Sequence, residues 1–356
     1  MAAWVLIAFV LLPISSYASG VDTEALVYAL PTEIREEIGI TPESGDLSAA
    51  MKSLLRKGEH ILREGLGKIL AEGFVILAAS AACGMFSAFV GPLQSESLGK
   101  TVEVTGICTV AALCIGGASG VLDACHSSID RLSSFSSVFV PVYGAAVTIS
   151  GHPAAALSSA TATLLASNLL LTLAGRLLIP IIYLHIVLSA AGLISENDLM
   201  GSLADLLRKG ALGFFKYFLM LYTGYISLSG LISSGTDALT LRTAKTTISG
   251  SVPVLGSVIS DVSETLLSGA VVLKNAIGIY GFVGAIALCL VPFVTAAIRY
   301  LAFKLLTVTA SGVSNGRMGK LLSAIAESYS MALGLLGTCC MLLFLSFVVG
   351  SVVISH

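Results

Sequence analysis

The sequence predicts an all-α integral membrane protein, a helical bundle of seven or eight transmembrane helices with a short amphipathic N-terminal extracytoplasmic region. Three observations support this fold class. Of the 356 residues, 56% are hydrophobic and only 11% are charged, whereas a soluble domain carries about 25% charged residues. The mean hydropathy is +0.95. Thirty-six glycines against nine prolines suit closely packed membrane helices. This composition excludes an ordinary soluble enzyme.

The first 68 residues differ from the rest of the chain. Residues 1–18 have the layout of a secretory signal peptide, a short apolar stretch followed by small residues, with Ser16 and Ala18 placed as at a cleavage site. Because no Lys or Arg precedes the apolar stretch, an uncleaved first membrane anchor is the alternative. Residues 19–68 hold 15 of the chain's 40 charged residues and are predicted to be extracytoplasmic. Residues 69–356 are then a polytopic helical membrane domain.

The end of this polar segment predicts an amphipathic helix from Leu47 to Ile69. Its apolar residues recur at helical spacing on one face, and Gly58 and Gly65 lie on that face, where a neighbour could approach closely. This periodicity indicates that one face of the helix is buried, but it does not indicate which part of the protein, partner or membrane covers that face. The helix either leads along the surface into the next span or docks a partner.

A bilayer core about 30 Å thick requires roughly 20 apolar residues per helical crossing. Seven stretches meet this requirement: 70–91, 102–122, 154–175, 177–195, 211–233, 276–298 and 329–354. The stretch 136–151 contains Pro141 and is either an eighth crossing or a re-entrant hairpin. Three charged residues near span ends, Glu72, Glu103 and Lys216, are attributed to snorkelling.

Small residues predict close helix packing at two places. Gly116 and Gly120 form a small-xxx-small pair, and Gly278, Gly281 and Gly284 follow a three-residue period. Such residues let helix backbones touch in lipid, where no hydrophobic effect drives association. We expect these contacts to form within the chain rather than between subunits.

Catalytic and ligand-binding motifs are not found in the sequence. There is no Cys/His set with zinc spacing, no HExxH, no phosphate-binding GxxxxGK[ST] and no GxSxG elbow. No enzyme activity, metal or cofactor is therefore predicted, and clustered basic residues that would suit nucleic acid are lacking too. His185 lies within a span and is expected to be a structural, hydrogen-bonded residue. An intramembrane hydrolase would need it to act with a serine.

The stretch 246–281 carries the most informative polar pattern. Gly250, Pro253 and Gly256 interrupt its first part, and a helix is then predicted to start with Asp261 as N-cap and Glu264 completing a capping box. At 100° per residue a polar stripe lies within about 60° on this helix, with Lys274 on its flank. The stripe consists of Asp261, Glu264, Ser268 and Asn275. It is either a polar lining or partner contact, as in transporters with broken helices, or the solvated face of an interfacial helix.

The same stretch also carries a resemblance to a known family. From Lys245 the sequence KTTISGSVPVLGSVISDVSETLLSGAVVLKNAIGIYG resembles the most recognisable segment of stage III sporulation protein AE of endospore-forming Firmicutes. The layout of the chain is similar as well, with a signal-like start, a short exported region and a series of apolar spans that ends in an apolar helix. The resemblance covers most of the chain.

The resemblance implies a multi-pass protein of the mother-cell membrane that surrounds the forespore. Its expected role is that of a permease-like or export-platform component of the channel between mother cell and forespore, needed for late forespore development. The implied partners are the other membrane proteins of the stage III A sporulation operon and, through the assembly, stage II sporulation protein Q. The alternative is a stand-alone secondary transporter of a small solute, which would place ionisable residues near the midplane of related repeats.

Overall fold

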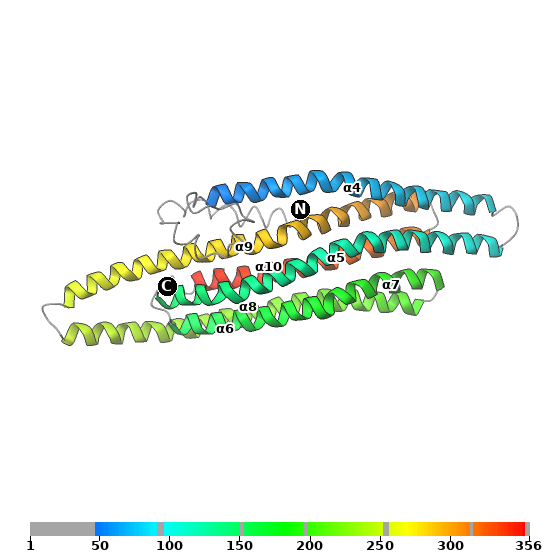
Figure 1. Ribbon diagram of the computed structural model, residues 1–356. Helices are drawn as coiled ribbons and strands as arrows, with labels where there is room; N and C mark the ends of the chain where they lie inside the picture. Colours follow the sequence, from blue (N-terminus) through cyan, green and yellow to red (C-terminus); the bar gives the residue numbers. More distant parts are fainter. Residues whose placement is uncertain are drawn as a thin grey trace.

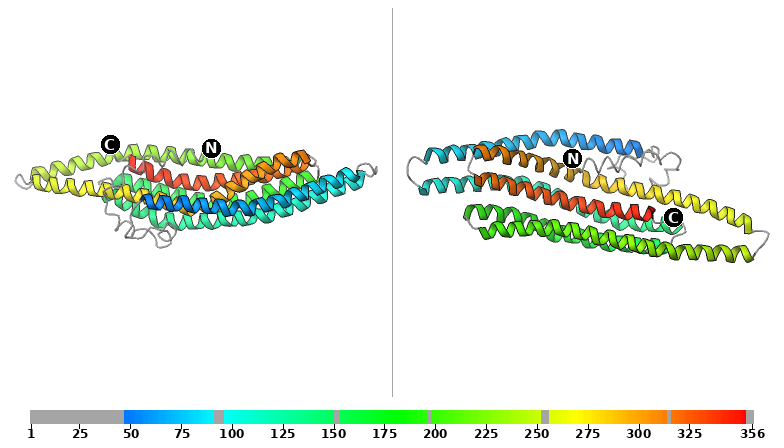
Figure 2. Two further views of the ribbon diagram at one scale, coloured as in Figure 1. Left: turned by 90° about the horizontal axis from the view of Figure 1, so that it is seen from above. Right: turned by 180° about the vertical axis from the view of Figure 1, so that it is seen from behind.

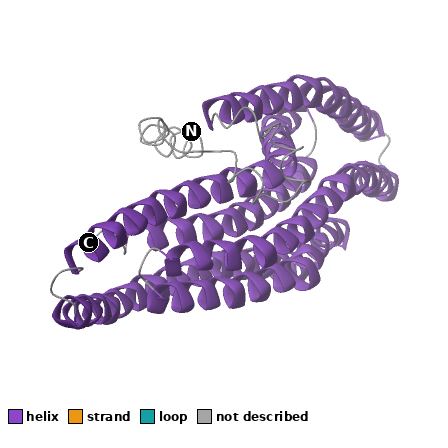
Figure 3. Cartoon of the chain, turned by 60° about the vertical axis from the view of Figure 1, so that its left-hand side comes forward, coloured by secondary structure: helices purple, strands orange, loops and turns teal. Residues whose placement is uncertain are grey.

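Long helices make up every part of the chain that the computed structural model describes, which is residues 47–90, 96–149, 153–195, 198–251, 256–313 and 316–352 (Figure 1 and Figure 3). The predicted signal peptide or anchor at 1–18 lies outside these ranges. The all-helical fold class is confirmed for the described residues. The elements are α4 (Leu47–Val90), α5 (Glu96–Ile149), α6 (Pro153–Leu173), the π-helical turn η4 (Ala174–Leu178), α7 (Ile179–Ser195), α8 (Asp198–Ser251), α9 (Gly256–Val313) and α10 (Gly316–Val352).

Six of these helical segments, not seven or eight, are long and apolar enough to cross a membrane within the described ranges. They are Lys52–Phe86, Gly99–Ala145, Ala160–Ser195, Asp198–Leu228, Val283–Ala310 and Gly316–Leu345. The predicted number of crossings was therefore too high. The reason is that a 20-residue hydropathy window divides a long helix wherever a polar group interrupts it, although the chain does not turn there.

Two pairs of predicted spans are in fact single helical runs. The stretches 154–175 and 177–195 lie along α6, η4 and α7, where a π-helical turn absorbs Gly175 and Arg176 without reversing the chain. The stretches 102–122 and 136–151 lie along α5, which continues through Pro141 to Ile149. The stretch 136–151 is thus neither a separate crossing nor a re-entrant hairpin within its described part.

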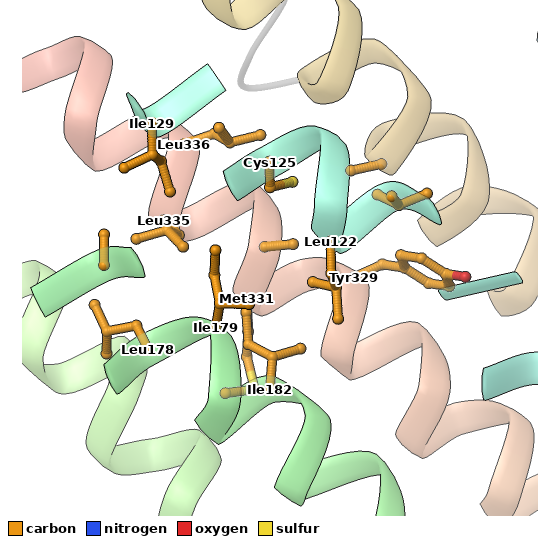
Figure 4. Close-up of a cluster of buried hydrophobic side chains, with 14 of the residues drawn as sticks. Leu122, Cys125, Ile129, Leu178, Ile179, Ile182, Tyr329, Met331, Leu335 and Leu336 are labelled. Atoms are coloured by element: carbon orange, nitrogen blue, oxygen red, sulfur yellow. The ribbon is translucent and has the colours of Figure 1, made fainter. Parts of the chain in front are cut away.

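The helices lie side by side in one elongated bundle, with α8 and α9 extending beyond the others at one end and α4 and α5 at the opposite end (Figure 1 and Figure 2). α10 is the most buried of the six candidate spans and contacts α5, α6, α7, α8 and α9. The centre of the core joins α5, α7 and α10 (Figure 4). Its residues include Leu122, Cys125, Ile129, Leu178, Ile179, Ile182, Tyr329, Met331, Leu335 and Leu336.

The amphipathic helix predicted at 47–69 is the first half of α4, and α9 of the same chain packs against the part of its apolar face that holds Leu54 and Ile69, whereas Leu55, Leu62 and Leu66 stay exposed. Three glycines of α4 face three aliphatic side chains of α9, so that a Cβ atom built on each glycine would lie in contact distance. The pairs are Gly58 with Leu290 (3.9 Å), Gly65 with Ile298 (3.4 Å) and Gly73 with Leu306 (3.5 Å). Because both residue numbers rise together, the two helices run parallel. We call this line of contacts the glycine seam.

A topology experiment distinguishes one crossing from two in residues 153–195. Reporter domains fused after Ser150 and after Glu196 should report opposite sides of the membrane, because α6, η4 and α7 form one continuous crossing. Two separate crossings at 154–175 and 177–195 would place both reporters on the same side. Alkaline phosphatase and green fluorescent protein fusions, normalised to protein level, provide the measurement.

Candidate functional site

A bidentate ion pair joins α4 and α9 halfway along the bundle. Arg299 Nη1 lies 2.9 Å from Glu72 Oε2, and Arg299 Nη2 donates to Glu72 Oε1 at 3.2 Å. The arginine side chain is only 12% exposed, whereas Glu72 is 47% exposed. Parallel bonds of this kind are stronger than neutral hydrogen bonds and fix the orientation of both groups. The pair therefore ties α4 to α9 between the last two contacts of the glycine seam.

The surroundings of Arg299 depend on a glycine of α5. A Cβ atom at Gly117 would lie 2.8 Å from Arg299 Nη1, so a larger residue there would displace the guanidinium. Tyr329 of α10 packs its ring against Phe303, with centroids 5.5 Å apart. Arg299 of α9 and the buried Tyr329 hydroxyl of α10 also interact with each other. Four helices thus meet at one polar point around the Arg299 guanidinium.

Two further ion pairs connect helices. Arg317 of α10 lies 3.5 Å from Glu103 of α5, and Arg208 of α8 lies 3.6 Å from Glu327 of α10. Glu72 and Glu103, which the sequence analysis attributed to snorkelling, are thus paired across helices instead. Arg299 was not predicted as a site residue, because it lies just past the end of the predicted span 276–298. The exposed Lys216 is compatible with snorkelling.

His185 of α7 forms a buried hydrogen bond with Ser328 of α10, at 2.8 Å between Nδ1 and Oγ. Ser328 also donates its hydroxyl to the carbonyl oxygen of Ala324 at 3.1 Å. Because a hydroxyl has a single proton, His185 Nδ1–H is then the donor to Ser328 Oγ. A serine nucleophile must instead give its proton to the histidine. The geometry is that of a structural link between helices, as expected for His185, rather than of an activated serine.

The described cysteines add no ligand site. All seven are free thiols, and Cys114, Cys125, Cys289 and Cys339 are buried among apolar side chains. Within the described ranges no group of three or more His, Cys, Asp or Glu side chains is arranged to hold a metal ion. The polar groups of the bundle bind one another.

The residues of the predicted polar stripe all lie on α9. The helix begins at Gly256, so Asp261 is inside it and the prediction of Asp261 as N-cap was wrong. The side chains of Asp261, Glu264, Ser268, Lys274 and Asn275 lie outside the described part of the structure. Of the predicted breaks, Gly250 is the last residue but one of α8, Gly256 is the first residue of α9, and Pro253 lies in the undescribed connection. The stripe therefore stays a prediction.

The glycines that were predicted to allow close helix packing differ in how closely other helices approach them. A Cβ atom on Gly281 would collide with the ring of Phe139, so α9 and α5 approach closely there. Gly284 is buried, and the surroundings of Gly278 lie outside the described part. Gly116 and Gly120 are exposed, with nothing within 4 Å of an added Cβ. This pair makes no close contact with the described residues.

Comparison with known proteins gives two matches in sequence. The family model described as stage III sporulation protein AE matches residues 40–354. A curated relative, "Stage III sporulation protein AE" of Bacillus subtilis (strain 168), is 27% identical over 285 residues, which is 80% of this chain and 70% of the relative. No solved structure matches the chain.

The ion pair between α4 and α9 predicts a measurable coupling. Arg299→Met leaves Glu72 without its partner and should destabilise the protein by about 1–3 kcal/mol, between the values typical of exposed and buried pairs. The double variant Glu72→Gln/Arg299→Met should lose less than the sum of the two single variants. Thermal unfolding of the purified protein in detergent measures both effects.

The control for this cycle is the pair Glu59 and Arg63, which lies within α4 at 2.7 Å and is mostly exposed. Its removal should cost under about 0.5 kcal/mol, as for other pairs one helical turn apart. Equal effects of the two cycles would contradict a structural role for the interhelical pair.

Proposed function

The chain belongs to the stage III sporulation protein AE family, and from this membership we propose that it is a permease-like or export-platform component of a channel linking mother cell and forespore. The family match spans the whole described bundle, and the six candidate spans make the chain a multi-pass membrane protein. In this proposal the protein resides in the mother-cell membrane that surrounds the forespore. It supports late forespore development by holding a path open rather than by chemical catalysis.

The observation that best supports a path through this protein is the set of ion pairs that join helices within the candidate spans. Glu72–Arg299, Glu103–Arg317 and Arg208–Glu327 all lie within candidate spans and link α4, α5, α8, α9 and α10. Ionisable residues inside membrane bundles are costly and commonly mark substrate or ion pathways. The family name is not that of an enzyme, which agrees with polar groups that bind one another.

We further propose that the chain works with other membrane proteins of the stage III A sporulation operon and, through that assembly, with stage II sporulation protein Q. A component of a larger path needs no second copy of its polar pattern. A stand-alone secondary transporter, by contrast, would carry related sites in two repeats. The sequence shows no clear second copy of the 246–281 pattern.

Removal of the chain tests the proposed function. A spore-forming strain that lacks it should grow normally but arrest after engulfment, with far fewer heat-resistant spores, because the channel would lose one of its components. Affinity purification of the tagged, functional chain should recover the operon's other membrane proteins. Normal spore yield, or transport of a solute by the purified chain alone in vesicles, would contradict the proposal.

The polar stripe on α9 gives a second prediction. Replacement of Asp261 and Glu264 by Ala should impair sporulation after engulfment without lowering the protein level, because a wetted lining or partner contact loses two carboxylates. Asp198→Ala removes an exposed acid of α8 and serves as the control. Spore counts and immunoblots are the measurements, and a normal spore yield for the α9 variant removes the stripe from the proposed path.

A further inference from the structure

The outer side of α4, which forms one edge of the bundle, carries two arginines at a regular spacing (Figure 1). Arg56 and Arg63 are seven residues apart and both are exposed, so they lie on the same side of the helix, about 10.5 Å from each other. Arg63 lies 2.7 Å from Glu59 within α4, whereas Arg56 has no ion-pair partner among the described residues. Lys52, one turn before Arg56, is exposed as well. We call these four residues the basic face of α4.

The outer side of α5 carries two acids at the same spacing. Asp123 and Asp130 are seven residues apart and both are exposed, and the exposed Arg131 lies at the edge of this side. His126 lies 3.6 Å from Asp130, whereas Asp123 has no ion-pair partner among the described residues. Most other exposed residues of α5 within about 100° of this direction are small. They are Thr101, Thr105, Thr109, Ala112, Gly116, Gly120, Ser127, Ser134, Ser137, Pro141 and Ala145. We call this side, with its two acids, the acidic face of α5.

Two contacts fix the level of α5 along α4. A Cβ atom built on Gly117 of α5 would lie 3.5 Å from the carboxylate of Glu72, and one built on Gly106 would collide with Cys83. Because the residue number falls in α5 as it rises in α4, the two helices run antiparallel. Residues 52–68 of α4 therefore lie level with residues 121–137 of α5.

The charges of the two faces match at this level. By the same register Arg56 lies level with residue 133 and Arg63 with residue 126 of α5. Asp130 and Asp123 are each three residues, or about 4.5 Å, from these positions, in the same direction. Arginine side chains are long enough to span such an offset. Both arginines can therefore reach an aspartate when a basic face and an acidic face are placed side by side.

We propose that the acidic face of α5 docks against the basic face of α4 in a second copy of this chain, with Arg56 on Asp130 and Arg63 on Asp123. All copies of a multi-pass protein share one membrane plane, so residues at one level in one copy lie at that level in the next. A rotation about an axis along the helices then joins the two faces without a shift along that axis. Contacts of this kind close into a ring rather than a filament. The inference does not depend on the proposed function.

Contacts between two identical faces are disfavoured by the same charges. Since the copies share one level, two acidic faces would place Asp123 beside Asp123 and Asp130 beside Asp130 of the next copy. Two basic faces would bring arginines together in the same way. Like charges that face each other suppress an association, whereas opposite charges fix its register. The charge pattern therefore favours the contact between unlike faces.

Side-chain size favours the same contact. The basic face consists of long side chains and the acidic face mostly of short ones, so that the aliphatic stems of the former can lie over the latter. Gly120 has nothing within 4 Å of an added Cβ, which leaves its backbone open to a neighbour. The hydroxyl of Ser127, between the two acids, can accept a hydrogen bond from a guanidinium. Elsewhere the bundle exposes large apolar side chains that suit lipid, such as Phe74 and Leu221.

Photo-cross-linking in membranes of sporulating cells tests the proposal. The photoreactive residue p-benzoylphenylalanine takes the place of Ser127 in a full-length tagged chain, and a second copy with a different tag is made in the same cells. Ultraviolet light should join the two chains, and mass spectrometry should place the new bond within residues 52–68 of the second copy. The same photoreactive residue in place of Met220, which is 68% exposed on α8, is the control and should not give this product.

Charge reversal tests the assigned pairs. Asp123→Arg/Asp130→Arg should lower the yield of the product at least about tenfold, because like charges then face each other. Addition of Arg56→Asp/Arg63→Asp to the same chain should restore the yield, since the two faces again carry opposite charges. This recovery also shows that the reversed chain still folds.

Every other outcome overturns the proposal. A bond to α5 of the second copy means that identical faces meet, and a bond to a different protein means that another partner covers the acidic face. Formation of no protein product means that lipid or water covers it. An unchanged yield after charge reversal, or a loss that the second pair of substitutions does not restore, rules out docking through these charges.

Discussion

Charged side chains at membrane depth must be either paired or wetted, and this requirement organises the bundle. The interhelical pair between Glu72 and Arg299 satisfies it at the point where α4, α5, α9 and α10 meet. A lone arginine there would be costly, whereas a bidentate partner on the next helix offsets much of that cost. Because desolvation of Arg299 offsets much of the attraction to Glu72, the pair specifies how the helices meet more than it adds stability.

Close packing of α4 on α9 is what brings that pair together. Without a hydrophobic effect between helices in lipid, contact area and small residues decide which helices associate. Gly58, Gly65 and Gly73 recur at seven or eight residues and present a nearly flat strip to aliphatic side chains of α9. The same packing turns the charged side of α4 outward. The glycines on the apolar side of this amphipathic helix thus bring Glu72 close to Arg299 and also turn the charged side of α4 away from α9.

Much of the fold could be predicted from the sequence, because only helices and closed barrels span lipid and the continuous apolar stretches of about 20 residues here fit helices. The helical class and the amphipathic helix at 47–69 follow from composition and periodicity. The number of crossings does not, since hydropathy alone cannot distinguish a turn from a helix that continues through a π-helical turn at Gly175 or through Pro141. The ion-pair partners of Glu72 and Glu103 could not be predicted either, because they lie far away in the sequence. Glu72 and Arg299, for example, are 227 positions apart.

The central claim is that ionisable groups at membrane depth are paired across helices or face water. Electron cryo-microscopy of the chain within its assembly, in lipid nanodiscs, tests it most directly. The account predicts continuous density between Arg299 and Glu72 inside the bilayer. Arg299 extended to the headgroups, with Glu72 unpaired, would contradict it.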